Sequence, residues 1–486
     1  MDTHFRTRVG CLFHVVLVAV LALLGWQAYW HLHGSDWLLD QPTNRRLTRL
    51  EHRVPRGMIL DRAGEKLAWS NGVTREYADG RATAALLGYL DQQYGREGLE
   101  MRWNGELSGL SRTFTGQDLR RMARNEAPRG NDLLLTLDLR LQRIAHDTLG
   151  ERTGAIVVLD PATGGILGMA TQPTYHAATL RADFPRLSAD PRKPLRNRAT
   201  QDFYPPGSTM KLVTAAAALM HGQGADTAQT CAGGVARRYG VNVRDFGGAA
   251  HGRLTMPKAL EKSCNQYFAQ LAAELPPADF AETAAAFGFG RRWWEERNYL
   301  PDPRMLPLRM AVSSLTPGPD MTTSQGERAH MGFGQSTVVA TPLQMAMVAA
   351  AIANEGKLMA PYLVAAVRKG GTQRTLRSLR SGPIGFPLDR QRARELAAMM
   401  RGVVEHPGGT ARGARVAGLT VYGKTGTAQQ RGGADHAWFV GFAEREGRGS
   451  SPRRIAFAVL LERGGTGGGV AVPLAKRLLE RWRDLE

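Results

Sequence analysis

An apolar stretch near the N-terminus constrains this chain more than any other feature of its sequence. Residues 11–30 read CLFHVVLVAVLALLGWQAYW and contain no Asp, Glu, Lys or Arg. A helix of about twenty such residues is long enough to cross the hydrocarbon core of a bilayer. Arg6 and Arg8 precede the stretch, which favours a cytoplasmic N-terminus and export of the remainder. Trp26, Tyr29 and Trp30 end it, as aromatic residues do at a membrane–water interface.

A cleaved signal peptide is the alternative interpretation of this stretch. The bulky aromatic residues leave no good small-x-small cleavage site after the apolar run, so we expect an uncleaved anchor. We assign residues 1–10 to a cytoplasmic tail and residues 11–31 to a single transmembrane helix. The rest of the chain is then expected on the outer, periplasmic side of the cytoplasmic membrane.

The charge balance is strongly basic, with 63 Lys and Arg against 44 Asp and Glu, a formal charge of +19. Such a surplus attracts anionic surfaces, including nucleic acid, acidic lipid headgroups and polymers that carry carboxylates or phosphates. The basic residues are spread along the chain without a dense run or a zinc-finger spacing, so we expect no nucleic-acid partner.

The chain contains three cysteines, Cys11, Cys231 and Cys264, too few for a disulfide framework and without a zinc signature. Two interpretations are open for Cys231 and Cys264 if they lie outside the cytoplasm. They form a disulfide with each other, or they are small buried residues without one. We favour burial. The histidines form no HExxH-type pattern, so the sequence does not indicate metal catalysis.

The remaining sequence predicts an α+β fold. Residues 32–135 read as a stalk and a short, partly extended platform, and residues 136–486 as the main domain. In the main domain we expect a helix from Asp138 and strands at 155–159, 166–170, 419–422, 437–442 and 455–461. Residues 208–290 read as mainly helical, and an amphipathic helix closes the chain near 473–485. This order favours an antiparallel sheet with flanking helices and an inserted helical lobe.

The most informative local pattern is Ser208-x-x-Lys211. Pro205, Pro206 and Gly207 resist helix and an Ala-rich run follows, so Ser208 is predicted at a helix start, with Lys211 on the same face of the first turn. A serine hydroxyl becomes a nucleophile when a nearby base takes its proton, and a lysine can be that base when burial favours its neutral form. The pair alone is also consistent with an ordinary helix cap.

Two further triplets strengthen a catalytic interpretation. Ser263-Cys264-Asn265 follows a helical run, and Lys424-Thr425-Gly426 precedes Thr427 on a predicted edge strand. They supply a second amine, an amide and further hydroxyls, with a glycine expected to let a substrate backbone approach closely. Each has a structural alternative, a helix cap for the first and a surface hairpin for the second. The ordered set is typical of penicillin-binding proteins and class A β-lactamases.

With these motifs the chain resembles a class B penicillin-binding protein. PRGMILDRAGEKLA at 55–68 and GYLDQQYGREGLE at 88–100 are similar to the signatures of its platform. RNRATQDFYPPGSTMKLVTAAAAL, HGRLTMPKALEKSCNQYF, GFGQSTVVATPLQMAMVAAAIANEGKLMAPYLV and HAWFVGF are similar to its transpeptidase domain. The short platform resembles the compact members of the family.

The resemblance implies a role for each candidate residue. Ser208 would attack the penultimate D-Ala carbonyl of a stem pentapeptide, and Lys211 would accept its proton. Ser263, Asn265 and Lys424 would relay that proton and position the substrate. Thr425 and Thr427, with Lys424, would bind the terminal carboxylate, and the backbone N–H groups of Ser208 and Thr427 would form the oxyanion hole. β-Lactams would acylate Ser208, and the resemblance implies no metal or organic cofactor.

The resemblance also implies a partner and leaves alternatives. Related proteins work beside a SEDS-type glycosyltransferase, and we expect one here.

A β-lactamase of class A would need a Glu-x-x-Leu-Asn string, which the sequence lacks. A DD-carboxypeptidase and a catalytically inactive scaffold of cell division or elongation remain as alternatives. The sequence does not distinguish a role in division from one in elongation.

Overall fold

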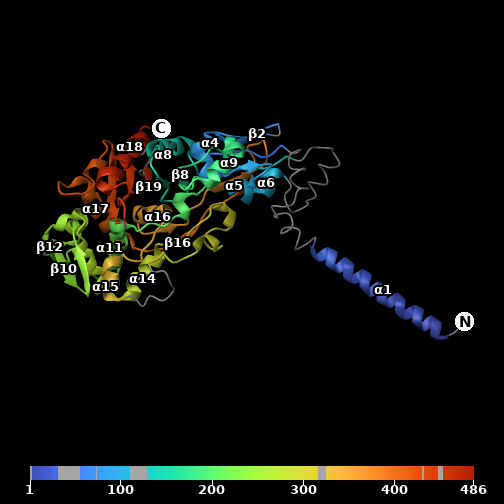
Figure 1. Ribbon diagram of the computed structural model, residues 1–486, viewed down its shortest axis with the longest axis horizontal. Helices are drawn as coiled ribbons and strands as arrows, with labels where there is room; N and C mark the ends of the chain where they lie inside the picture. The colour runs from blue at the N-terminus through green and yellow to red at the C-terminus, as the bar shows by residue number, and fades with distance from the viewer. Residues whose placement is uncertain are drawn as a thin grey trace.

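A computed structural model describes residues 3–30, 55–72, 74–109, 129–315, 324–429, 432–446 and 453–485. The predicted stalk lies largely outside these residues. Helix α1 (Thr3–Tyr29) includes residues 11–29 of the predicted anchor, and its Val9–Tyr29 segment has a mean hydropathy of 2.4 with none of it buried. In Figure 1 this helix stands apart from the folded body. Its apolar side chains are exposed. A helix of this length and composition fits a single membrane span.

The platform is built on a six-stranded sheet with the order β15-β14-β6-β1-β2-β3. Its N-terminal strands are β1 (Ile59–Leu60), β2 (Lys66–Asn71) and β3 (Thr74–Tyr77), followed by α4 (Gly80–Leu87), the small pair β4 (Leu90–Asp91) and β5 (Gly95–Arg96), α5 (Gly98–Arg102) and α6 (Asn104–Ser108). Strand β6 (Asp132–Leu135) runs parallel to β1, and all other pairs are antiparallel. Strands β14 (Val364–Arg368) and β15 (Thr375–Ser378) come from far along the chain. The platform sheet is therefore continued by the segment assigned to the main domain, and the boundary at residue 135 remains a prediction.

The two platform motifs meet in a buried ion pair. Glu100 is wholly buried, and its carboxylate accepts hydrogen bonds from Arg56 Nε at 2.8 Å and Arg75 Nε at 2.7 Å. Arg75 also donates to the carbonyl of Gly57 at 2.9 Å. Burial opposes ionisation of Glu100, but Arg75 and Arg56 hold its pKa below the usual value. The motifs at 55–68 and 88–100 thus form one structural unit.

The main domain contains a five-stranded antiparallel sheet with the order β17-β18-β19-β7-β8. Its strands are β7 (Gly154–Leu159), β8 (Ile166–Gln172), β17 (Leu419–Ala428), β18 (His436–Arg445) and β19 (Arg453–Leu461). Each was predicted from the sequence and each is longer than predicted, β7, β8 and β19 by only one or two residues. Helix α16 (Pro342–Ala353) is buried along its whole length and packs on β19, β18 and β7. Helices α8 (Leu139–Leu149) and α18 (Val472–Arg483) pack together against the sheet from the opposite side, as Figure 1 shows. The α+β architecture with flanking helices is confirmed.

A lobe inserted between β8 and β17 lies at the end of the body away from α1 (Figure 1). Its helices include α11 (Lys211–Met220), α12 (Met256–Lys262), α13 (Asn265–Glu274), α14 (Pro277–Ala286) and α15 (Gln325–Met331). Helix α17 (Arg390–Glu405) contacts α12, α11 and β17 and so joins the lobe to the sheet. Shorter elements complete the connections: α9 (Leu180–Ala189), α10 (Arg198–Gln201), β13 (Leu358–Met359) and β16 (Pro383–Gly385).

The expectation of a mainly helical segment at 208–290 was wrong for residues 228–255. This part forms strands β9 (Ala228–Cys231), β10 (Val235–Arg238), β11 (Val241–Arg244) and β12 (Gly252–Thr255), paired β10–β11 and β9–β12. Glycines with positive φ, such as Gly240 and Gly247, break the segment into lengths too short for helices and favour turns between strands.

Candidate active site

Ser208 lies in a tight helical turn that leads directly into α11. The turn, η3 (Gly207–Met210), begins at Gly207, which has φ of 56° and donates its N–H to the carbonyl of Gly334 at 2.9 Å. A Cβ at Gly207 would lie 2.7 Å from the carbonyl oxygen of Thr427. The turn therefore packs directly against β17, and only a glycine allows that approach. Ser208 itself is partly exposed, as expected for a group that reacts with a substrate.

Lys211 is the first residue of α11 and is wholly buried. Its Nζ donates to the Ser263 carbonyl at 2.6 Å, to Asn265 Oδ1 at 2.7 Å and, more weakly, to Ser263 Oγ at 3.2 Å. The ring of Phe268 lies with its centre 5.7 Å from the same nitrogen. Lys211 thus contacts both the serine and the asparagine of the second motif.

Burial lowers the pKa of Lys211 to about 8, although Cys264 and Asp245 act in the opposite direction. The neutral form of the Lys211 amine is therefore far more populated near neutral pH than that of a lysine in water. This amine is suited to accept a proton near neutral pH, which a lysine in water is not.

The second motif lies at the junction of two helices. Ser263 follows α12 in the left-handed conformation, with φ of 60° and ψ of 38°, and Asn265 begins α13. The Asn265 side chain is fixed at both ends, because Oδ1 accepts from Lys211 and Nδ2 donates to the Arg244 carbonyl at 2.9 Å. Its backbone N–H donates to the carboxylate of Asp245. A left-handed serine is strained, so the surrounding contacts must hold it in place.

Lys424 approaches Ser263 from the other side. It is wholly buried in the edge strand β17, and its Nζ donates to Ser263 Oγ at 2.8 Å and to the Thr425 carbonyl at 3.1 Å. Burial, reinforced by the nearby Lys211, lowers its pKa well below the usual value. The hydroxyl of Ser263 is therefore held between two buried amines.

The other residues of the third motif divide into two roles. Thr425 and Thr427 line the cleft, and their hydroxyls bond to Thr410 Oγ1 at 2.9 Å and to the Gly467 N–H at 3.3 Å. Gly426 faces the protein interior, where a Cβ would lie 2.9 Å from the Pro206 carbonyl oxygen. The glycine thus lets β17 pack on the turn before Ser208, which differs from the expected role in admitting a substrate backbone.

These segments enclose a cleft of about 900 Å³ whose lining includes Ser208, Ser263, Asn265, Thr425 and Thr427. Lys211 and Lys424 are buried behind this lining, and the Nζ atom of each donates a hydrogen bond to Ser263 Oγ. The cleft also presents the cations Arg244 and Lys262. Its size suits a peptide or a small-molecule ligand.

Sequence reasoning missed two residues at this site. Thr410, the partner of Thr425, stands 15 residues earlier in a loop, and no pattern marks a single loop hydroxyl. Asp245, which anchors the Asn265 N–H, lies in the segment that was expected to be helical. Tertiary contacts bring both residues to the cleft.

Comparison with known protein families gives two matches. Residues 154–480 match the family described as the penicillin binding protein transpeptidase domain, and residues 56–133 match the penicillin binding protein A dimerisation domain. The two matched regions correspond to the main domain and the platform.

Individual relatives agree with these matches. The chain is 31% identical to the peptidoglycan D,D-transpeptidase PbpA of Mycolicibacterium smegmatis, with 98% of each protein covered. It is 33% identical to the peptidoglycan D,D-transpeptidase MrdA of Acinetobacter baumannii over 75% of this chain and 56% of that protein. The ceftriaxone acyl-enzyme complex of Mycobacterium tuberculosis penicillin-binding protein A superposes with a TM-score of 0.78 at 29% identity, covering 89% of this chain and 99% of that one.

Proposed function

This chain belongs to the class B penicillin-binding proteins, and on that basis we propose that its cleft cross-links peptidoglycan stem peptides through an acyl-enzyme on Ser208. It is a serine D,D-transpeptidase, and β-lactams are its covalent inhibitors. One observation carries the assignment of the site: Ser208, Ser263 and the two threonines of β17 line one cleft, and the buried Lys211 amine is hydrogen-bonded to Ser263.

Acylation begins with proton transfer from Ser208 Oγ to the neutral amine of Lys211. The oxygen attacks the carbonyl carbon of the penultimate D-Ala, and the resulting tetrahedral intermediate loses the terminal D-Ala as its peptide C–N bond breaks. The leaving nitrogen takes a proton, and Ser263 Oγ, 3.2 Å from Lys211 and 2.8 Å from Lys424, lies on a route that can deliver it.

The donor peptide is bound along β17. This strand is at the edge of the sheet, so its outer backbone groups are available to a peptide that adds as a further strand. The hydroxyls of Thr425 and Thr427 line the cleft and would bind the terminal carboxylate, while the wholly buried Lys424 would act through Ser263. The N–H groups of Ser208 and Thr427 would stabilise the oxyanion; the close approach of Gly207 to the Thr427 carbonyl supports their proximity.

Deacylation transfers the acyl group to an amine of a neighbouring stem peptide. A new amide bond forms, the ester breaks, and Ser208 Oγ regains its proton. A β-lactam acylates the same oxygen, but its leaving nitrogen remains tethered to the acyl group when the lactam C–N bond opens. The tethered group obstructs the acceptor, which makes the adduct long-lived.

The location of the reaction follows from α1. We propose that α1 anchors the protein in the cytoplasmic membrane with residues 1–10 inside and the main domain outside, because Arg6 and Arg8 precede the apolar helix. The platform, which lies between α1 and the lobe in Figure 1, would bind a SEDS-type glycosyltransferase. Recovery of no such protein when the full chain is purified from membranes after mild cross-linking would count against this partner.

Fluorescent penicillin tests the proposed nucleophile. We expect one covalent adduct per full-length chain, located by peptide mapping at Ser208, and none with Ser208→Ala. Ser336→Ala is the matched control, because Ser336 lines the same cleft and should label normally. An adduct on Ser208→Ala would overturn the assignment.

A second assay separates the reaction types. Incubation with a stem pentapeptide and an amine acceptor should yield a cross-linked product with release of D-Ala. Hydrolysis alone would identify a carboxypeptidase, and a folded chain with neither turnover nor penicillin labelling would favour the scaffold.

A further inference from the structure

A second cavity lies away from the catalytic cleft, at the end of the main sheet where β18 stops and β19 starts. Its volume is about 310 Å³, and none of its described lining residues also lines the catalytic cleft. Five of its lining side chains are arginines: Arg62, Arg140, Arg445, Arg453 and Arg454. We call this cavity the arginine pocket. So many cations around a small cavity create a positive potential that attracts an anion.

The arginine pocket joins the platform to the main domain. Arg62 belongs to the turn between β1 and β2, and its backbone N–H donates to the Leu137 carbonyl at 2.8 Å. The adjacent Asp61 carboxylate accepts from the N–H of Leu139, the first residue of α8, at 3.1 Å. These bonds fix the platform turn on the start of α8, so Arg62 is held beside the arginines of the main domain.

Two of those arginines stand directly opposite each other on the sheet. Arg445 is the last residue of β18 and Arg453 is the first of β19, and the strand register pairs them. Like charges in this position repel each other. The neighbouring cross-strand pair is Glu444 with Arg454, which forms an ion pair at 2.6 Å. Burial, reinforced by Arg453, lowers the pKa of Arg445, so this pair of cations is not compensated as its neighbour is.

The guanidinium groups at this point have N–H donors to offer. Arg445 uses Nη1 to bind the end of α18, where it donates to the Arg483 carbonyl at 2.5 Å and the Leu485 carbonyl at 2.7 Å. Among the described residues, no hydrogen bond or ion pair is recorded for Arg445 Nε and Nη2 or for the side chains of Arg62 and Arg453. Three guanidinium groups therefore present donors to the pocket.

The carboxylates of the pocket are engaged elsewhere. Asp138 caps α8 and forms an ion pair with Arg140 at 3.3 Å. Asp160 accepts from the Ala162 N–H at 2.9 Å and from the Thr163 hydroxyl at 2.8 Å. Neither carboxylate is recorded in an ion pair with Arg62, Arg445 or Arg453 within the part of the chain that the structure describes. The positive charge of these three residues is left for a ligand.

We propose that the arginine pocket binds the phosphate group of a phosphate ester. The planar guanidinium fork matches the oxygens of a phosphate or a carboxylate. A phosphate monoester carries about two negative charges, and so compensates three arginines better than a single carboxylate does. Leu141, Ile455 and Trp482 also line the pocket and provide an apolar wall, so an organic group of about the size of glycerol or a sugar fits beside the phosphate.

A bound phosphate would bridge the two parts of the protein, because Arg62 comes from the platform and Arg445 and Arg453 from the main domain. A lipid headgroup and a water-soluble phosphate ester share this chemistry. Binding at this place does not depend on the reaction proposed for Ser208. It should raise the melting temperature of the full-length chain, since a ligand of the folded state stabilises that state.

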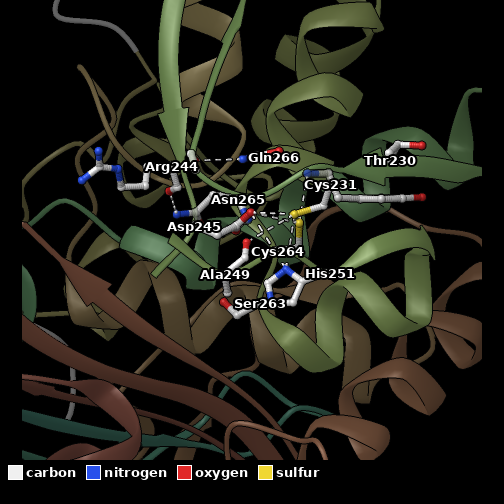
Figure 2. Close-up of polar contacts among 12 residues, drawn as sticks. Thr230, Cys231, Arg244, Asp245, Ala249, His251, Ser263, Cys264, Asn265 and Gln266 are labelled. Carbon is white, nitrogen blue, oxygen red and sulfur yellow. Dashed lines mark hydrogen bonds and ion pairs between the residues drawn. The ribbon is translucent and has the colours of Figure 1, made fainter. Parts of the chain in front are cut away.

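The catalytic cleft also contains cations, so the position of a bound phosphate has to be established. Figure 2 shows one of them, Arg244, with its guanidinium group directed away from Asn265. Arg244 is exposed and lines the catalytic cleft but not the arginine pocket. Substitution Arg244→Gln therefore removes a cation from the cleft and leaves the pocket intact.

Isothermal titration calorimetry of the full-length protein in an uncharged detergent tests the proposal, with glycerol phosphate as the probe. We expect one saturable site per chain, and no binding of glycerol. Arg62→Gln and Arg453→Gln should each weaken binding about tenfold, and the double variant should show none. Arg477→Gln is the matched control, because Arg477 is an exposed arginine of α18 outside the pocket. It should bind like wild type, and so should Arg244→Gln.

Circular dichroism and the melting temperature without ligand show whether each variant is folded, and Arg453→Lys keeps the charge without the guanidinium fork, so its affinity should lie between those of Arg453→Gln and wild type. Ser208→Ala should bind glycerol phosphate normally, which separates this proposal from the proposed function. No saturable binding by wild type would overturn the proposal. Equal weakening by Arg477→Gln and Arg453→Gln, or a loss of binding in Arg244→Gln alone, would also overturn it.

The deacylated lipid headgroup glycerophosphoglycerol separates the two sources of the ligand. It carries a phosphodiester, whereas glycerol phosphate carries a monoester with more negative charge. Tighter binding of the diester, lost in the Arg62→Gln and Arg453→Gln double variant, would support the site and assign it to a lipid headgroup. Tighter binding of the monoester with the same loss would support the site and assign it to a water-soluble ester.

Discussion

The Nζ atom of Lys424 donates a 2.8 Å hydrogen bond to Oγ of Ser263, although this lysine is wholly buried. The same oxygen is 3.2 Å from Nζ of Lys211. Ser263 therefore links two amines whose pKa values are both lowered by burial. A proton that Lys211 takes from Ser208 has a hydrogen-bonded path away from it through this hydroxyl.

Substitution Ser263→Ala should slow penicillin acylation about 10²-fold, because it removes this link while Lys211 keeps its bonds to the Ser263 carbonyl and Asn265. The rate is measured by stopped-flow labelling with fluorescent penicillin. Since residue 263 has a positive φ, Ser263→Gly serves as a companion that relieves backbone strain. Both variants should fold and should be acylated slowly. A wild-type acylation rate in either variant would mean that Ser263 has only a structural role at the end of α12.

Acylation should depend on pH through Lys211. Its pKa is lowered by burial to about 8, and only the neutral amine accepts the Ser208 proton. The acylation rate should therefore rise about tenfold per pH unit below this value and become constant above it. Rates measured from about pH 6 to about pH 9 with a neutral β-lactam test this. A flat profile would exclude titration of a lysine base in this range.

Substitution Asn265→Asp should move that profile to higher pH. The new carboxylate would lie where Oδ1 now accepts from Lys211 at 2.7 Å, and a negative charge this close favours the ammonium form. We expect the midpoint to rise by about one unit or more and the rate at pH 7 to fall about tenfold. Asn242→Asp is the control, because Asn242 is exposed in the same cleft. An unshifted midpoint in Asn265→Asp would contradict the role of Asn265 as a partner of the base.

The platform should depend on Glu100. Substitution Glu100→Gln would leave the buried Arg56 and Arg75 without their common anion, at an expected cost of about 3–5 kcal/mol in the free energy of unfolding. Urea unfolding measures this cost. Glu97→Gln breaks only the more exposed pair with Arg309, and should change stability by less than about 1 kcal/mol. Equal effects of the two changes would refute the structural role of the buried pair.

The predictable parts of this fold were those with local signals. Asp138 begins α8 with its side chain accepting from the N–H groups of Arg140 and Leu141, and alternation or apolar runs marked the sheet strands. The order β17-β18-β19-β7-β8 joins strands nearly 300 residues apart in the chain, so it depends on tertiary packing that no window of sequence contains. The sequence identified the three motifs, but it did not predict which hydrogen bonds join their side chains.

The residues that sequence reasoning missed lack a local pattern. Thr410 is a single loop hydroxyl, and the strands at 228–255 are short pieces between glycines whose pairing decides their conformation. Gly426 was identified from its motif, but we expected it to let a substrate backbone approach. Successive residues of a strand face opposite sides, and a Cβ at Gly426 would face the Pro206 carbonyl and not the cleft.

That placement predicts the effect of Gly426→Ala. The added methyl group would lie 2.9 Å from the Pro206 carbonyl oxygen and 3.0 Å from both Thr209 Cγ2 and Trp438 Cβ, so β17 must move away from the turn that holds Ser208. Because the proposed oxyanion hole uses one N–H from each of these segments, the acylation rate should fall about 10²-fold or more, beyond what any loss of folded protein explains. Gly105→Ala is the matched control: a Cβ there meets nothing within 4 Å, and the residue is in helix α6. Acylation by folded protein is compared after active-site titration and circular dichroism. If Gly426→Ala acylates as fast as Gly105→Ala, the close packing of β17 on the turn is not needed for catalysis, and a substrate-facing role for this glycine would have to be reconsidered.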